Sequence, residues 1–182
     1  MKNLSIKNSI MMLILVAVLS SCSQGESLQS YFVFNQEKAD FMSVDIPANF
    51  LNLDDQNLTD EQMKAYESMN KLNMLGFTKT ESNQAVYEAE LVKVRALLKD
   101  PKYQELFRGG SSTDGKITVK YIGDDDSIDE LIIFGTANDK GFAIVRVLGD
   151  NMEPGKIMQL GDVVKDLNFE SSDLKQFTGF FQ

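Results

Sequence analysis

KITVKYI at residues 116–122, DELIIFGT at 129–136 and FAIVRVL at 142–148 are the runs from which the architecture of the protein is predicted. All three runs are rich in β-branched and aromatic residues, and apolar and polar side chains alternate cleanly in the first. The segment Asn138-Asp139-Lys140-Gly141 separates the last two runs and has the composition of a hairpin turn. The stretch therefore predicts a C-terminal three-stranded meander.

Two more strands are predicted upstream of the meander. Residues 41–46 alternate, with one apolar face, and Pro47 ends the run. Residues 72–79 carry apolar side chains on both faces, which is typical of a central strand. With the meander, this gives a sheet of about five strands.

Helical patterns occur between and after these strands. Residues 84–99 have the clearest one, capped by Ser82 or Asn83 and with an apolar stripe at steps of four, three and four residues. The stripe consists of Tyr87, Leu91, Val94 and Leu98. Residues 59–62 form a capping box that predicts a second helix. Asp100-Pro101 predicts a short helix that ends at Gly109-Gly110, and a last helix is predicted over residues 153–160.

This order of elements predicts an α+β fold. We expect a single mixed or antiparallel sheet with the helices packed on one face, in one domain over residues 31–182. The other face of the sheet is then open to solvent or to a partner.

The N-terminus has the pattern of an export signal. Residues 1–9 carry Lys2 and Lys7 and no acidic residue, and residues 10–19 are an unbroken apolar run. Ten helical residues rise about 15 Å, half of a hydrocarbon core of roughly 30 Å, so the run is too short to span a bilayer comfortably. Ser20, Ser21 and Cys22 follow it.

The segment Leu19-Ser20-Ser21-Cys22 resembles the lipobox of bacterial lipoproteins. The resemblance implies removal of residues 1–21, cleavage between Ser21 and Cys22, and acylation of Cys22. Two or more acyl chains give stable anchoring. Residues 23–30 then form a tether behind the lipidated cysteine. Ser23 occupies the position where an aspartate retains some lipoproteins in the inner membrane, so we expect the outer membrane.

Two absences limit the chemistry. The 182 residues include no histidine, and Cys22 is the only cysteine. Mechanisms that need a Ser-His-Asp or Cys-His arrangement are excluded, as are metals ligated by His or Cys. We expect no cofactor and no metal. The formal net charge of −9 also argues against nucleic acid and against polyanionic partners.

Three segments of the sequence are candidate sites. The acidic residues 124–126 fit either calcium or a solvated turn, and they depart from the EF-hand pattern. The segment Asp126-Ser127-Ile128 resembles the O-glycosylation motif of envelope proteins in Bacteroidota, which makes Ser127 a candidate modification site. The aromatic tail with Phe177, Phe180 and Phe181 either packs on the core or docks a partner.

Four segments carry a family resemblance: residues 41–51, 98–108, 115–123 and 128–160. From about residue 30 to residue 160 the chain resembles a family of Bacteroidota lipoproteins known only as a domain of unknown function. The resemblance implies a small α+β domain at the envelope and assigns no site residue.

The sequence favours a non-catalytic envelope lipoprotein that works by binding or assembly. Its partners would be the membrane, through Cys22, and another envelope protein. Two alternatives stay open: an accessory in envelope-stress sensing or signalling, and a hydrolase that uses carboxylates alone.

Overall fold

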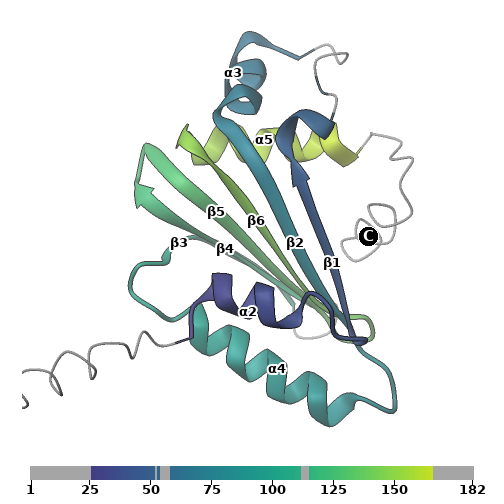
Figure 1. Cartoon of the computed structure of the whole chain (residues 1–182). Helices are drawn as coiled ribbons and strands as arrows, with labels where there is room; N and C mark the ends of the chain where they lie inside the picture. Colours follow the sequence, from purple (N-terminus) through teal and green to yellow (C-terminus); the bar gives the residue numbers. More distant parts are fainter. Residues whose placement is uncertain (1–25, 52, 54–57, 112–114, 166–182) are drawn as a thin grey trace, which may run out of the picture.

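The computed structural model describes residues 26–51, 53, 58–111 and 115–165. Within them, six strands form one antiparallel sheet in the order β1-β2-β6-β5-β4-β3 (Figure 1). The strands are β1 Phe41–Pro47, β2 Met69–Thr78, β3 Gln104–Ser111, β4 Gly115–Asp124, β5 Ser127–Ala137 and β6 Gly141–Met152. The helices are α2 Leu28–Asn35, the short 3-10 helix η1 Ala48–Leu51, α3 Asp60–Ser68, α4 Gln84–Leu97 and α5 Pro154–Lys165.

The connection through α4 sets the topology. Strand β2 lies beside β1, and the chain then passes through α4 to β3 at the opposite edge of the sheet. The meander β3-β4-β5-β6 returns from that edge until β6 pairs with β2. Helix α4 therefore crosses one face of the sheet on its way between the two edges (Figure 1).

Several sequence predictions are confirmed. The meander is present as β4, β5 and β6, and residues 138–140 form the turn between the last two strands. Strand β2 has neighbours on both sides, as its two apolar faces predicted. The capping box at the start of α3 is formed: the N–H of Gln62 donates to Thr59 Oγ1 at 3.2 Å, and the N–H of Thr59 donates to Gln62 Oε1 at 2.9 Å.

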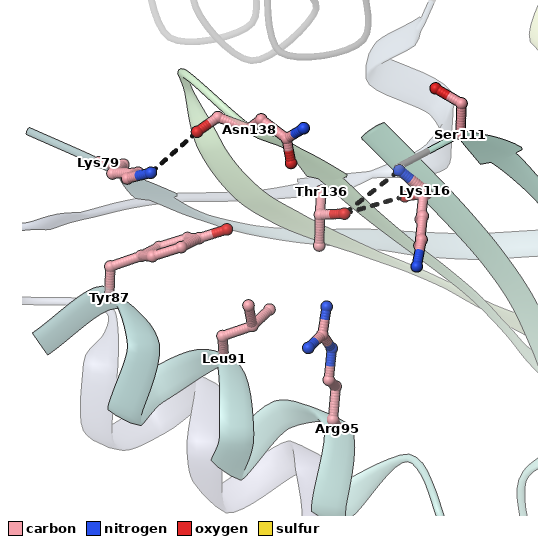
Figure 2. A pocket seen from close by; sticks show the side chains of 8 residues that line it. All are labelled: Lys79, Tyr87, Leu91, Arg95, Ser111, Lys116, Thr136 and Asn138. Carbon is pink, nitrogen blue, oxygen red and sulfur yellow. Dashed lines mark hydrogen bonds between the residues drawn. The ribbon is translucent and has the colours of Figure 1, made fainter. Parts of the chain in front are cut away.

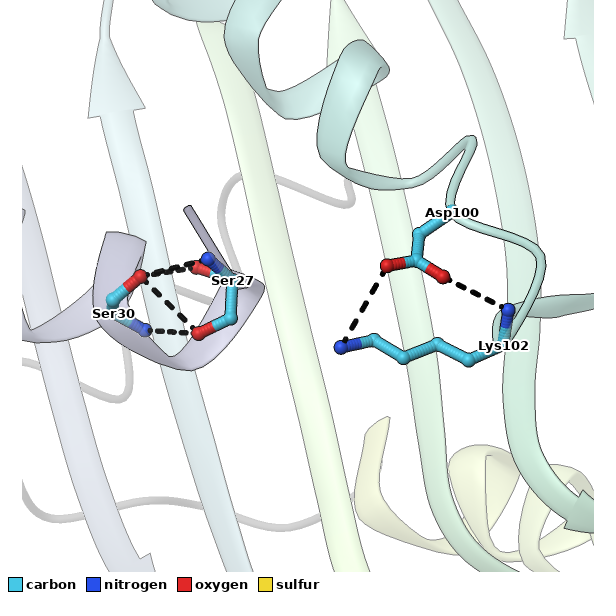
Figure 3. Close-up of polar contacts among 4 residues, drawn as sticks. All are labelled: Ser27, Ser30, Asp100 and Lys102. Atoms are coloured by element: carbon cyan, nitrogen blue, oxygen red, sulfur yellow. Dashed lines mark hydrogen bonds and ion pairs between the residues drawn. The ribbon is translucent and has the colours of Figure 1, made fainter. Parts of the chain in front are cut away.

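The predicted helix after Pro101 is wrong. Residues 104–111 instead form β3, the edge strand, which brings the number of strands to six. The carboxylate of Asp100 accepts a hydrogen bond from the N–H of Lys102 at 3.1 Å, so it closes a turn and caps no helix (Figure 3). Most side chains of β3 are exposed, so its apolar residues do not mark a buried face of the strand. Backbone pairing with β4, and not side-chain burial, determines that these residues form a strand.

The prediction that helices pack on one face of the sheet is also wrong. Phe142 and Ile144 of β6 belong to a core under α2 and α4, whereas Ala143, Val145 and Val147 belong to a second core with η1, α3 and α5. Consecutive residues of β6 are apolar and buried, so both faces of the strand need cover. The sheet therefore has helices on both sides (Figure 1).

Helix α2 was not predicted. Its first residues, 28–30, were expected to belong to the tether. The hydroxyl of Ser27 accepts a hydrogen bond from the N–H of Ser30 at 3.0 Å, and Ser30 Oγ accepts one from the N–H of Ser27 at 2.8 Å (Figure 3). This is a capping box with serine in place of the usual Glu or Gln. Burial of Leu28, Tyr31 and Phe32 fixes the helix to the sheet.

One buried ion pair lies in the core under α2. Arg146 of β6 donates to both carboxylate oxygens of Glu130 of β5, at 2.6 and 3.1 Å. The two side chains are 8% and 11% exposed, and the guanidinium lies 5.3 Å from the centre of the Phe32 ring.

In the described part of the chain, no helix has the length and apolar content needed to cross a bilayer.

Candidate functional site

Two hollows lie between α4 and the sheet. Their volumes are about 330 Å³ and about 520 Å³, and they adjoin because Arg95, Lys116 and Thr136 line both. We call the pair the basic groove. The described residues that line it are Lys79, Tyr87, Leu91, Arg95, Leu98, Lys99, Glu105, Arg108, Ser111, Lys116, Thr118, Lys120, Phe134, Thr136 and Asn138.

Helix α4 forms one wall of the basic groove. Tyr87, Leu91 and Arg95 are spaced by four residues, so they form one row along the helix, and all three face the sheet (Figure 2). Lys99, four residues further on, continues the row beyond the end of the helix. The row is apolar at its start and cationic at its end. Packing of the apolar start of this row on the sheet thus places the two cations, Arg95 and Lys99, at the groove.

Strand β4 forms much of the other wall. Its side chains alternate between the two faces of the sheet. Val119 and Tyr121 are buried in the core beneath α3 and α5, and Ile117 packs against it. Lys116 and Lys120 therefore point to the α4 side, where both line the groove. The clean alternation that predicted this strand also placed its lysines on one face.

Arg95 and Lys116 approach each other across the first hollow. The guanidinium of Arg95 extends from α4 towards the sheet, and the ammonium of Lys116 extends from β4 towards the helix (Figure 2). Neither forms an ion pair with any residue in the described part of the chain. Thr136 of β5 is the strand partner of Lys116, and its hydroxyl exchanges hydrogen bonds with the backbone of Lys116 at 3.3 and 3.4 Å (Figure 2). The positive charges of Arg95 and Lys116 thus lie in the same hollow.

The lysines at the ends of the groove are held by backbone carbonyls. Lys79 Nζ donates to the carbonyl of Asn138 at 2.9 Å and lies 5.2 Å from the centre of the Tyr87 ring. Lys120 Nζ donates to the carbonyl of Tyr103 at 2.8 Å. A neutral carbonyl orients an ammonium group without cancelling its charge. Both lysines therefore still contribute positive potential to the groove.

Glu105 is the one acidic side chain among the described residues of the lining. It accepts two hydrogen bonds from Arg108, at 2.6 and 3.1 Å. These hydrogen bonds hold the pKa of the Glu105 carboxyl below its usual range. Its charge is therefore already offset by Arg108, and it neutralises little of the potential of the other cations.

Six basic side chains and one acidic one line the basic groove, in a chain whose net charge is −9. A cleft with charges of one sign concentrates the field and attracts counter-ions. Arg and Lys donors, with the hydroxyl of Thr136, suit phosphate, sulfate or carboxylate. Burial raises the pKa of Tyr87, so its phenol stays a neutral hydrogen-bond donor at the groove.

Among the described residues, none of those that the sequence singled out as sites lines this groove. Ser127 begins β5, and its half-buried hydroxyl donates to Asn151 Oδ1 at 3.1 Å. The acidic residues 124–126 are exposed at the turn from β4 to β5, and Asp125 accepts a hydrogen bond from the Tyr121 hydroxyl at 2.6 Å. The described residues include no group of three or more acidic side chains placed to hold a metal ion. Ser21, Cys22 and the aromatic tail lie outside the described residues.

Sequence reasoning missed every cation of the groove. Two signals were present: the four-residue step from Arg95 to Lys99, and the lysines at alternate positions of the strand over 116–122. The net charge of the whole chain concealed them, because a sum over all residues contains no information on where the charges lie.

A comparison with models of protein families gives a match. The model of a family described as "Domain of unknown function (DUF4252)" matches residues 31–160, which include all the described lining of the basic groove. The match confirms the predicted resemblance to a domain of unknown function. No curated protein matches the chain.

Proposed function

The chain belongs to the family of DUF4252 domains of unknown function, and on that premise we propose that it is a non-catalytic binding module of the bacterial envelope. Its binding site is the basic groove, and its ligand is an anion. Its place is the outer membrane, where the lipid on Cys22 anchors it with the domain facing the periplasm or the cell surface.

The observation that carries this proposal is the pair Arg95 and Lys116. Charged side chains in a folded protein are usually solvated separately or paired with an opposite charge. Here two exposed cations extend from different elements into the same hollow, and neither has an ion-pair partner among the described residues. An anion between them would remove their repulsion and accept hydrogen bonds from both.

The lining also argues against the hydrolase alternative. Glycoside hydrolysis with carboxylates needs two acidic side chains on opposite sides of the scissile bond. The described lining holds one, Glu105, and Arg108 occupies both of its oxygens. A signalling accessory remains compatible with the groove, because a sensor also needs a ligand site.

The chain between Cys22 and the fold is short. Residues 23–27 alone separate Cys22 from the first residue of α2. Six steps of extended chain reach at most about 20 Å. A lipid on Cys22 would therefore hold the domain close to the bilayer surface.

Calorimetric titration of the mature protein with inorganic phosphate tests the binding site. Arg95→Gln and Lys116→Gln each remove one charge-assisted hydrogen bond, which is worth about 1.5–3 kcal/mol, so the affinity should fall about tenfold or more. Lys64→Gln is the matched control, because Lys64 is an exposed lysine of α3 and lies outside the groove. Equal losses in all three variants, or no binding by the unaltered protein, would remove the basis of the proposal.

A further inference from the structure

We infer that the natural ligand of the basic groove carries two anionic groups, one bound between Arg95 and Lys116 and the other between Lys99 and Lys120. This inference rests on the proposed function, because it specifies the class of anion that the same groove binds.

The cations recur along the groove in two steps. Arg95 and Lys99 are four residues apart on the row of α4, and Lys116 and Lys120 are four residues apart on the facing strand. At the first step Arg95 of α4 and Lys116 of β4 are available, and at the second step Lys99, in the turn after α4, and Lys120 of β4. A ligand with a single anionic group would use only one of these two pairs.

The backbone geometry sets the spacing of the two anionic groups. Four residues rise about 6 Å along a helix and about 13 Å along a strand. Two groups that each contact both walls are therefore separated by roughly 6–13 Å. This distance excludes a diphosphate, whose two phosphorus atoms share one oxygen, and fits two phosphate, sulfate or carboxylate groups on a longer skeleton.

The second position keeps its charge despite the nearby acid. Glu105 lines the same hollow, but its two hydrogen bonds with Arg108 offset it. Lys120 is oriented by the carbonyl of Tyr103 and has no ion pair with any residue that the structure describes. The second position thus retains the positive charges of Lys99 and Lys120.

The lining between the charges is uncharged. Thr118 lies between Lys116 and Lys120 on the same face of β4, and Leu98 and Phe134 line the same hollow with side chains that are almost completely buried. The skeleton between the two anionic groups would lie beside these side chains. An uncharged skeleton suits this lining better than a continuous chain of charged groups.

The test uses ligands of equal charge and different length. The mature protein is titrated with α,ω-alkane bisphosphonates whose two phosphonates are separated by one to ten methylene groups, and with butylphosphonate as the single-ended reference. We expect the affinity to peak at an intermediate length, at least about tenfold above that of the one-carbon bisphosphonate. In the double variant K99Q/K120Q this peak should disappear, and the affinity for butylphosphonate should fall less than the affinity for the best-binding bisphosphonate.

Each other outcome has one meaning. If affinity is independent of length, or rises with each methylene equally in the double variant and the unaltered protein, the two-position inference is wrong and the anion site at Arg95 and Lys116 stands. If neither butylphosphonate nor any bisphosphonate binds, the proposed function itself is wrong. The control K64Q should follow the unaltered protein at every length, and circular dichroism shows that the double variant is folded.

Discussion

Removal of the Glu130 carboxylate should destabilise the protein more than removal of any other single charged group from the ion pairs of the described residues. The Glu130→Ala variant leaves Arg146 charged, 8% exposed and without its two carboxylate acceptors. Breaking a buried pair from one side costs about 3–5 kcal/mol, because the remaining charge has no water around it. For a chain of this length, that corresponds to a fall in Tm of roughly 6–20 °C.

Urea unfolding of two variants side by side gives the comparison. Glu105→Ala removes a carboxylate that likewise accepts two hydrogen bonds from an arginine, Arg108. Both side chains of this pair are exposed, so the urea midpoint of the variant should hardly change. Replacing both partners, as in the double variant Glu130→Leu with Arg146→Met, should recover most of the lost stability, because the core then contains no unpaired charge. If Glu130→Ala and Glu105→Ala shift the midpoint equally, the burial argument is refuted.

Four further predictions concern the groove, the pH dependence and the anchor. Lys116→Gln should leave the midpoint of urea unfolding of the ligand-free protein unchanged or slightly raised, since it relieves repulsion from Arg95, and a lowered midpoint would mean that the lysine serves the fold instead. Anion affinity should fall steadily between 50 and 500 mM salt, in calorimetric titrations, because ions screen exposed charges over about 10 Å at 0.1 M. Burial and the hydrogen bond to Glu90 raise the pKa of Tyr31, so the unfolded chain loses this proton first; unfolding free energy should fall as pH rises above about 10, and less steeply in Tyr31→Phe. Cys22→Ala should move the protein out of the membrane fraction and abolish crosslinks to any envelope partner, and an unchanged membrane fraction would exclude Cys22 as the anchor.

The regular elements that sequence predicted correctly are those with a buried, periodic face. The row Tyr87, Leu91, Val94 and Leu98 identified α4, and the alternation over residues 116–122 identified β4. In both, the side chains that make the pattern also make the core. In these two elements the local sequence pattern and the tertiary packing favour the same structure, so the element can be predicted from the sequence.

The errors lie where pairing or capping decides the structure instead. The backbone of β4 fixes β3 at the edge, and the exposed side chains of β3 give no alternation. Two serines cap the eight residues of α2, and its single buried face is too short for a clear period. The helices on both faces were foreseeable from the consecutive apolar residues of β6, a pattern that one-sided packing does not produce.

The basic groove was not predictable from composition because it depends on two surfaces that meet only in the fold. Arg95 is about twenty residues from Lys116 in the chain; it follows Tyr87 and Leu91 on the row that faces the sheet, whereas Lys116 belongs to the polar face of a strand. Their convergence needs the crossing of α4 over the sheet and the return of the meander. Net charge, which argued against anionic partners, is a property of the whole surface and does not limit one cleft.

The most direct test of the anion site is an NMR titration of the mature protein with inorganic phosphate, followed at backbone amides and at the Arg95 side-chain Nε–H. If the groove binds the anion, the amides of Arg95, Lys116 and Thr136 and the Arg95 side chain should show large shifts that saturate. Shifts that spread over exposed lysines such as Lys64, or that grow without saturation, would contradict it.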